Sequence, residues 1–283
     1  MTEKTFSQAL DRDSILVAPG VPDTLSTLIA EQLGFQAAFL SGSAMAATHL
    51  GLPDIGLMTS EEIATIMRQI RERSNLPVIV DADSGFGNAY AVARTVRMFE
   101  LAGASAVQVE DMVNDKRPTE VTKRPVISVA DMQSKLKAAL DARHKDSTLI
   151  SARTDVRVTE GINEVVDRIS AFVDCGVDMV FAEGLENAVE RMQVVDAVSS
   201  KVPIIYNAAW PAKDTPTDQQ LEEEGFAVSL APKTIVAGMI SGVTEALMDL
   251  RNSSGIKTKH TIATTIDEAL SSKDYLDRFS KWK

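Results

Sequence analysis

Eight short apolar segments rich in β-branched residues recur along the chain and alternate with segments of helical periodicity. They cover residues 14–20, 37–43, 77–83, 106–111, 148–155, 179–184, 203–210 and 226–232. Runs of this length and composition are typical of buried strands. Eight such strands joined by helices predict an α/β protein with a (β/α)8 TIM-like barrel. A doubly wound open sheet shows the same alternation and remains the alternative.

Helical periodicity is clear in four connecting segments, residues 60–74, 91–102, 129–143 and 162–175. Their apolar residues recur every three or four positions, which places them on one face of a helix. Two further helical patterns follow the eighth strand, at residues 243–252 and 266–282. We therefore expect a catalytic barrel over residues 1–242, with residues 243–283 forming a C-terminal helical extension of the same domain.

The bulk composition excludes several classes of partner. A formal net charge of -11 disfavours nucleic acid, which binds a basic face. Apolar runs fall short of the ~18 residues of a membrane span, so no membrane partner is expected. The single cysteine, Cys175, cannot form an internal disulfide and fits a reducing compartment. Because the N-terminus also lacks the profile of a signal peptide, we expect a cytoplasmic protein.

Polar side chains gather where the predicted strands end. They are Ser41, Gly42, Ser43, Asp81, Asp83, Glu110, Asp111, Arg153, Thr154, Asp155, Glu183 and Asn207. In a barrel the carboxyl ends of the strands meet on one face, where active sites are built. The alternative for each residue taken alone is an ordinary polar loop position, because loops of any α/β protein are polar.

Asp81 and Asp83 are the most informative of these residues. Residues two apart on a strand point to the same side, so the two carboxylates project together and repel unless a cation lies between them. With Glu110 they form a set of hard oxygen donors, which suits Mg²⁺ or, alternatively, Mn²⁺. The sequence therefore predicts a metal site at the end of the third strand.

Two other strand ends have a functional and a structural interpretation each. The Ser41-Gly42-Ser43 segment could offer backbone N–H groups to an anion, or it could be a tight turn. Arg153 could bind a substrate carboxylate through two nitrogens, or it could pair with a carboxylate of the barrel. Both alternatives remain open at this point.

Six motifs together resemble the isocitrate lyase and phosphoenolpyruvate mutase superfamily. They lie at residues 41–47 (SGSAMAA), 50–54 (LGLPD), 81–88 (DADSGFGN), 109–111 (VED), 152–155 (ARTD) and 181–184 (FAEG). The superfamily includes methylisocitrate lyase, oxaloacetate decarboxylase and acetylhydrolase, and phosphonopyruvate hydrolase. The resemblance implies a Mg²⁺-dependent enzyme that cleaves or forms C–C or C–P bonds in small anionic 2-oxo or 2-hydroxy acids. It also implies a homotetramer, a dimer of dimers with a C-terminal helix swapped between subunits.

The same resemblance implies a role for each site residue. The metal site would comprise Asp81 and Asp83, with Asp54 and Glu110 in the surrounding shell. The substrate contacts would be Ser41, Gly42, Ser43, Asp83, Arg153, Glu183 and Asn207. The catalytic residues would be Arg153 together with Lys116 and Arg117, which stand in the segment that matches the gating loop of the family.

One position departs from the lyase pattern. Pro118 occupies the place of the gating-loop cysteine, which serves those lyases in proton transfer. Proline has no proton to give, so isocitrate or methylisocitrate lyase activity is not expected. Decarboxylation or hydrolysis of a 2-oxo dicarboxylate such as oxaloacetate needs no such acid and is the preferred hypothesis. The alternatives are a C–P bond enzyme acting on phosphonopyruvate, a family member that only binds its ligand, and a one-carbon transferase related to ketopantoate synthesis.

Overall fold

The protein forms a closed barrel of eight parallel strands in the order β1 to β8. The computed structural model describes residues 5–10, 14–113, 124–209, 212–252 and 265–279. Each strand pairs with the next, and β8 pairs with β1 to close the ring. The strands are β1 Leu16–Val21, β2 Ala38–Leu40, β3 Val78–Asp81, β4 Ala106–Glu110, β5 Leu149–Thr154, β6 Met179–Ala182, β7 Ile204–Asn207 and β8 Val228–Ala231. The prediction of a (β/α)8 barrel is confirmed.

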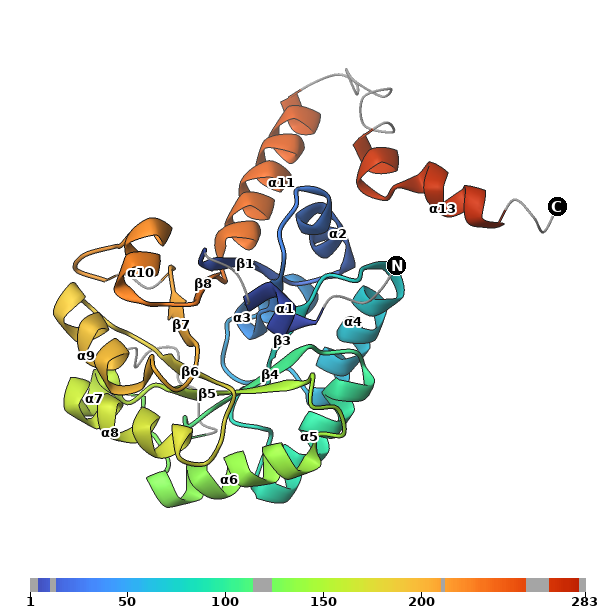
Figure 1. Cartoon of the computed structure of the whole chain (residues 1–283). Coiled ribbons are helices and arrows are strands. Elements are labelled where there is room, and N and C mark those ends of the chain that lie inside the picture. Colours follow the sequence, from blue (N-terminus) through green and yellow to red (C-terminus); the bar gives the residue numbers. More distant parts are fainter. Residues whose placement is uncertain (1–4, 11–13, 114–123, 210–211, 253–264, 280–283) are drawn as a thin grey trace.

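Helices surround the barrel, as Figure 1 shows. The helices up to β8 are α1 Phe6–Leu10, α2 Thr24–Gln32, α3 Gly42–Met45, α4 Ser60–Arg73, α5 Ala89–Leu101, α6 Val129–Ala142, α7 Arg157–Glu160, α8 Ile162–Val173, α9 Ala188–Val198 and α10 Asp218–Glu224. A one-turn π-helix, η1 (Ala46–Leu50), continues α3. The four helices predicted from periodicity are present, with ends shifted by at most two residues.

The second predicted strand is shorter than expected. It was predicted to run from residue 37 to residue 43, but β2 ends at Leu40 and α3 begins at Gly42. The reason is local, because the Ser41 hydroxyl accepts a hydrogen bond from the Ala44 N–H and caps the new helix. The prediction of a strand at residues 41–43 was therefore wrong, and this segment starts a helix beside the other strand ends.

The core has two layers, one inside the barrel and one between the strands and the helices. Strand residues alternate between these layers, and strands buried on both sides read as continuous apolar runs. Phe6 and Ala9 of α1 pack against the inner layer. The inside of the barrel is therefore solid packing rather than a pore, and it supports the site at the carboxyl ends of the strands.

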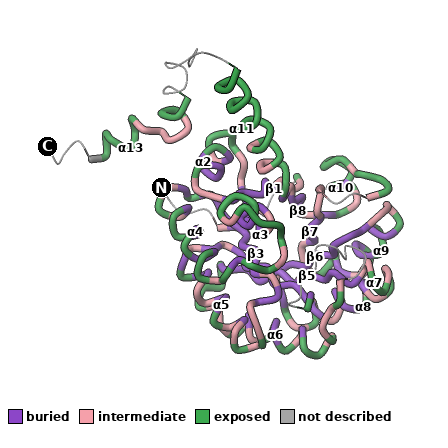
Figure 2. The backbone as a smooth tube through the Cα atoms, turned by 180° about the vertical axis from the view of Figure 1, so that it is seen from behind, coloured by how far each residue is buried: buried purple, intermediate pink, exposed green. Residues whose placement is uncertain are grey.

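The C-terminal part leaves the barrel. Helix α11 (Thr234–Asn252) runs through residues 242 and 243 without a break and projects away from the barrel, with no buried residue along its length (Figures 1 and 2). Helix α13 (Ser272–Phe279) follows, and Arg73 of α4 stacks on its Tyr275 ring at 4.4 Å. Among the described helices, none combines the length and the apolar character that a membrane crossing requires.

Candidate functional site

Three carboxylates meet at the ends of β3 and β4. One carboxylate oxygen from each of Asp81, Asp83 and Glu110 lies within 4.8 Å of the corresponding oxygens of the other two. Asp81 and Glu110 are buried, and Asp83 is half-buried. Three like charges this close raise the energy of the fold unless a cation neutralises them. The three residues predicted as metal ligands are thus brought together, and their hard oxygens fit Mg²⁺ or Mn²⁺.

A tight turn after β3 orients Asp83. The Gly85 N–H donates to the Ala82 carbonyl at 2.8 Å, and the Asp83 N–H donates to Oδ1 of Asp81 at 3.1 Å. Asp83 has φ 45°, in the left-handed region that aspartate and asparagine tolerate better than most residues. From the sequence, Asp81 and Asp83 were expected on one side of a continuous strand. In the structure the strand ends at Asp81 and a turn follows, and the turn still directs both carboxylates to the same cluster.

Gly42 lies directly against this cluster. Its N–H donates to Oδ2 of Asp81 at 3.3 Å, so in this structure the backbone donor predicted for the substrate binds a carboxylate of the site. The Ser41 and Ser43 hydroxyl oxygens lie 3.1 Å apart beside it. The segment 41–43 is therefore part of the site. It contains the start of α3, and the N–H groups at the start of a helix are compatible with binding an anion.

Replacing Gly42 with alanine should weaken metal binding without unfolding the protein. A Cβ there would lie 3.0 Å from Oδ2 of Asp81 and 4.0 Å from Oδ1 of Asp83. Alanine is a better helix former than glycine by about 1 kcal/mol, so the helix itself should gain stability. We expect weaker Mn²⁺ binding by calorimetry and an unchanged melting temperature or a higher one. Gly238→Ala on α11, with open space around it, is the control; equal metal affinity in both variants would contradict the close approach.

Arg153 at the end of β5 faces the acidic cluster. Its Nε and Nη2 donate to the two oxygens of Asp155 at 2.8 Å each, and its Nε lies 3.3 Å from Oε2 of Glu110. Its Nη2 also lies 3.8 Å from Oε2 of Glu183. The structural alternative for Arg153 is thus realised, and the guanidinium still lines the same site as the metal cluster.

Asp155 is among the polar residues expected at the end of the fifth strand, but no role in the site was predicted for it. Burial would raise the pKa of this carboxyl, but the charges of Arg153 and Arg124 outweigh burial and lower the pKa to about 2. Arg124 is the first described residue after position 113, and it forms an ion pair with Oδ1 of Asp155. The position of Asp155, two residues beyond Arg153 and directly after β5, was a usable signal. The basic residues 116, 117, 123 and 124 in the sequence indicate either a loop that closes over the site and suits an anionic substrate or a solvated surface loop. The pairing of Arg124 with Asp155 could not be predicted from them.

Asp111 is fully buried and belongs to a hydrogen-bond network next to the site. Its carboxylate accepts hydrogen bonds from the Thr154 hydroxyl at 2.7 Å, from the Asp155 N–H at 3.0 Å and from Nη1 of Arg168 at 3.2 Å. Burial raises the pKa of Asp111 to about 6, against these donors. The network ties the end of β4 to the end of β5 and so holds Asp155 in position.

Glu183 and Asn207 meet at the ends of β6 and β7. Nδ2 of Asn207 donates to both oxygens of Glu183, at 3.0 and 3.3 Å. Because Glu183 also approaches Arg153, the pair lies beside the same group of charged residues, and its contact with a substrate stays a prediction.

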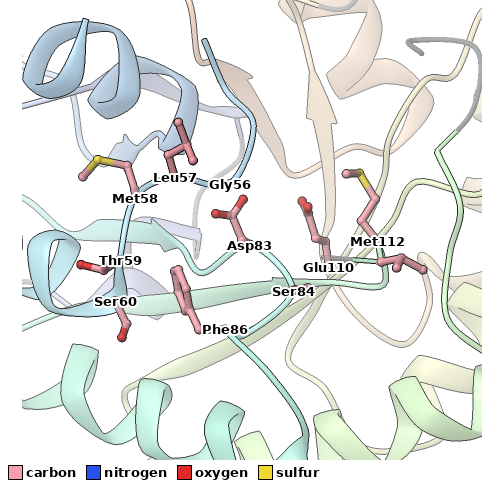
Figure 3. Close-up of a pocket in the computed structure, with 11 residues that line it drawn as sticks. Gly56, Leu57, Met58, Thr59, Ser60, Asp83, Ser84, Phe86, Glu110 and Met112 are labelled. Atoms are coloured by element: carbon pink, nitrogen blue, oxygen red, sulfur yellow. The ribbon is translucent and has the colours of Figure 1, made fainter. Parts of the chain in front are cut away.

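A cavity of about 390 Å³ opens beside the carboxylates. Figure 3 shows the side chains of Asp83 and Glu110 pointing into the same space, across from the segment Gly56–Ser60. Phe86 and Met112 give the cavity apolar walls. A small ligand in this cavity would reach Asp83 and Glu110 together.

The roles of three other predicted residues stay predictions. Asp54 is exposed in the loop that follows η1 and is not part of the three-carboxylate cluster, so its shell role stays a prediction. Lys116 and Arg117 fall outside the described residues, and their catalytic roles stay predictions as well.

Comparison with protein families decides the relationship of the chain. The family model described as phosphoenolpyruvate phosphomutase matches residues 6–249, which is most of the chain. The chain belongs to this family. The resemblance to the isocitrate lyase and phosphoenolpyruvate mutase superfamily is therefore confirmed.

Curated relatives within this superfamily are carbon–carbon lyases. The chain is 32% identical to 2,3-dimethylmalate lyase of Eubacterium barkeri over 286 residues, covering 98% of this chain and 93% of the relative. It is 36% identical to 2-methylisocitrate lyase of Aeropyrum pernix over 273 residues, covering 96% and 82%. These similarities support an enzyme.

Solved structures of the superfamily share the fold over nearly the whole chain. Oxaloacetate acetylhydrolase in complex with the inhibitor 3,3-difluorooxalacetate has a TM-score of 0.89 at 25% identity, covering 97% of this chain and 95% of that one. Phosphonopyruvate hydrolase in complex with oxalate and Mg²⁺ has a TM-score of 0.84 at 24% identity, covering 96% and 95%, which shows the fold alone. The proteins similar to this chain thus include lyases and hydrolases of small dicarboxylates and, at 25% identity, a phosphonopyruvate hydrolase.

Proposed function

We propose that the protein is a Mg²⁺-dependent lyase, decarboxylase or hydrolase that cleaves a C–C bond of a small 2-oxo or 2-hydroxy dicarboxylate such as oxaloacetate. The observation that carries this proposal is the cluster of Asp81, Asp83 and Glu110 with the Arg153 guanidinium directly beside it, 3.3 Å from Glu110. The carboxylates suit a divalent cation, and the neighbouring guanidinium suits an anionic substrate.

The chemistry of each side chain in the site suggests either a metal-binding or a substrate-binding role. Asp81, Asp83 and Glu110 would hold the ion, with Mn²⁺ as a possible substitute for Mg²⁺. The bound ion would act as a Lewis acid for the 2-oxo group and for the negative charge that develops as the C–C bond breaks. The Arg153 guanidinium and the backbone N–H groups of Gly42 and Ser43 would bind and orient the carboxylates of the substrate.

The remaining predicted contacts have supporting roles in this proposal. Asn207 and Glu183 would border the substrate on the side of β6 and β7, where their hydrogen bond fixes both side chains. Lys116, Arg117 and Arg153 are proposed as the catalytic residues, and Asp54 as part of the outer metal shell. Pro118 supports a reaction that needs no acid at the gating-loop position.

Relatives at 32% and 36% identity support C–C rather than C–P cleavage, because both are C–C lyases. A C–P bond enzyme of the phosphonopyruvate hydrolase or phosphoenolpyruvate mutase type is the second candidate. The matching family model is described as phosphoenolpyruvate phosphomutase, and this description supports the C–P bond enzyme as an alternative.

Product analysis tests the proposal. The protein is incubated with oxaloacetate, and separately with phosphonopyruvate, in Mg²⁺ and in EDTA, beside protein-free blanks that correct for spontaneous decarboxylation. Pyruvate identifies a decarboxylase, and oxalate with acetate identifies a hydrolase. Phosphate or phosphoenolpyruvate from phosphonopyruvate would replace the proposal with the C–P alternative. Mn²⁺ and oxaloacetate binding without turnover of any 2-oxo or 2-hydroxy dicarboxylate tested would indicate a protein that only binds its ligand.

We further propose a homotetramer built as a dimer of dimers, with α11 exchanged between subunits. Apolar residues at positions 240, 243, 247 and 250 recur at spacings of three and four, so they form one stripe along α11. Ile240, Val243 and Leu247 are 58–62% exposed, which is unusual for large apolar side chains lying in a continuous row. A second copy of the chain would cover this stripe.

The double substitution Val243→Asp and Leu247→Asp should break the assembly. Two charges buried in an apolar interface are unfavourable, so we expect light scattering to show species smaller than the wild-type tetramer. Glu245→Lys, a charged change at an exposed position of the same helix, should leave the tetramer intact. A monomeric wild-type protein at micromolar concentration would contradict the proposed assembly.

A further inference from the structure

Lys135 is a buried lysine in the middle of α6 whose role the proposed reaction does not explain. The residue is 9% exposed, although lysine is among the residues least often buried. Its ammonium Nζ donates to the Ser84 carbonyl oxygen at 2.8 Å, across 51 residues of sequence. A buried charge is unfavourable unless it is paired and hydrogen-bonded. The hydrogen bond to Ser84 therefore compensates part of the cost of burying this ammonium group.

The carbonyl that Lys135 binds belongs to the turn that carries Asp83. Ser84 follows Asp83 directly, and the backbone of this turn is unusual, with φ 45° at Asp83, 86° at Gly85 and 61° at Phe86. A side chain at Gly85 would have no room, because its Cβ would lie 2.3 Å from Cγ2 of Val92. Left-handed conformations at non-glycine residues cost energy and persist when their surroundings hold them.

The acidic cluster also acts on the charge of Lys135. Burial lowers the pKa of Lys135, while the negative charges of Asp131 and Glu110 raise it and partly offset the burial. Glu110, one of the proposed ligands, is thus among the charged groups that act on Lys135. The direct link between Lys135 and the site is its hydrogen bond to the Ser84 carbonyl, in the turn that orients Asp83.

We propose that Lys135 is a positioning residue of the metal site, which fixes the Asp83 turn through the Ser84 carbonyl and sets the affinity for the ion. The proposal rests on the function proposed above only in taking Asp81, Asp83 and Glu110 as metal ligands. Outer-shell groups of this kind typically change metal affinity by about 10- to 100-fold when removed.

Mn²⁺ binding by the full-length protein, followed by electron paramagnetic resonance and calorimetry, tests this proposal. Lys135→Met fills the same space without the charge, and we expect it to weaken Mn²⁺ binding by about 10- to 100-fold. Lys135→Arg restores a charged donor and should recover most of the affinity. Lys137→Met, an exposed lysine on the same helix, is the matched control and should bind Mn²⁺ like the wild type.

The outcomes separate this proposal from the proposed function. Wild-type protein that binds no Mn²⁺ would overturn the metal site itself. Wild-type binding with unchanged affinity in Lys135→Met would overturn the role of Lys135 alone, even if that variant melts at a lower temperature. If Lys135→Met does not fold, Lys135→Gln decides, because its shorter side chain carries no charge and should show the same loss of affinity.

Discussion

Asp83→Asn should abolish metal-dependent turnover while leaving the apo protein as stable as the wild type or more stable. Asparagine has the size of aspartate and also tolerates the left-handed φ of 45° at this position. The substitution removes one of three like charges whose oxygens can lie within 4.8 Å, so it relieves repulsion in the absence of an ion. Loss of an outer-shell partner costs about 10- to 100-fold in metal affinity, so loss of a ligand should cost at least about 100-fold.

Thermal unfolding in EDTA, Mn²⁺ binding and product formation measure the three consequences separately. Asp196→Asn, the same change at an exposed position on α9, is the matched control and should alter none of them. Wild-type turnover and Mn²⁺ affinity in Asp83→Asn would show that the ion, if one is used, binds elsewhere.

Arg153→Met should cost both activity and stability. The guanidinium holds two oxygens of Asp155, which is fully buried, and it lies against Glu110. Breaking a buried ion pair by removing one partner typically costs about 3–5 kcal/mol, and we expect a loss of this size in the free energy of unfolding at pH 7. Arg153→Lys keeps the charge without the paired geometry, so it should recover much of the stability but not the substrate affinity.

The pH dependence of this effect follows from the pKa of Asp155. In the wild type that pKa is about 2, below the usual value of 3.8, so the ionised carboxylate stabilises the fold above pH 4 and this contribution is lost as the pH falls toward 2. In Arg153→Met the pKa of Asp155 rises, so the difference from wild type should be large at pH 7 and smaller at pH 3. Urea unfolding at both values measures it.

Lys213→Met is the control for the arginine variant. It removes an ion pair whose lysine side chain is 77% exposed, and such pairs contribute about 0–1 kcal/mol. An Arg153→Met protein that loses no more stability than this control would show that Asp155 finds its compensation elsewhere.

Periodicity was sufficient to predict the architecture. Eight apolar runs gave eight strands, because parallel strands buried on both faces leave a clear apolar signature. The failure at residues 41–43 has a local cause, since the Ser41 cap begins a helix where apolar neighbours indicated a strand. Helix α11 begins at Thr234, nine residues before the pattern predicted at 243. The domain division at residue 242, the subunit assembly and the cytoplasmic location stay predictions.

The chain sequence by itself determined the barrel and the carboxylates that meet at its mouth. Asp81 and Glu110 end their strands and Asp83 follows one closely, and the closure of a parallel barrel brings such positions together. Two other contacts were decided by tertiary structure, the ion pair of Arg124 with Asp155 and the bond from Lys135 to the Asp83 turn. Both join residues more than 30 positions apart through long side chains, and the direction of a long side chain depends on packing that no local pattern encodes.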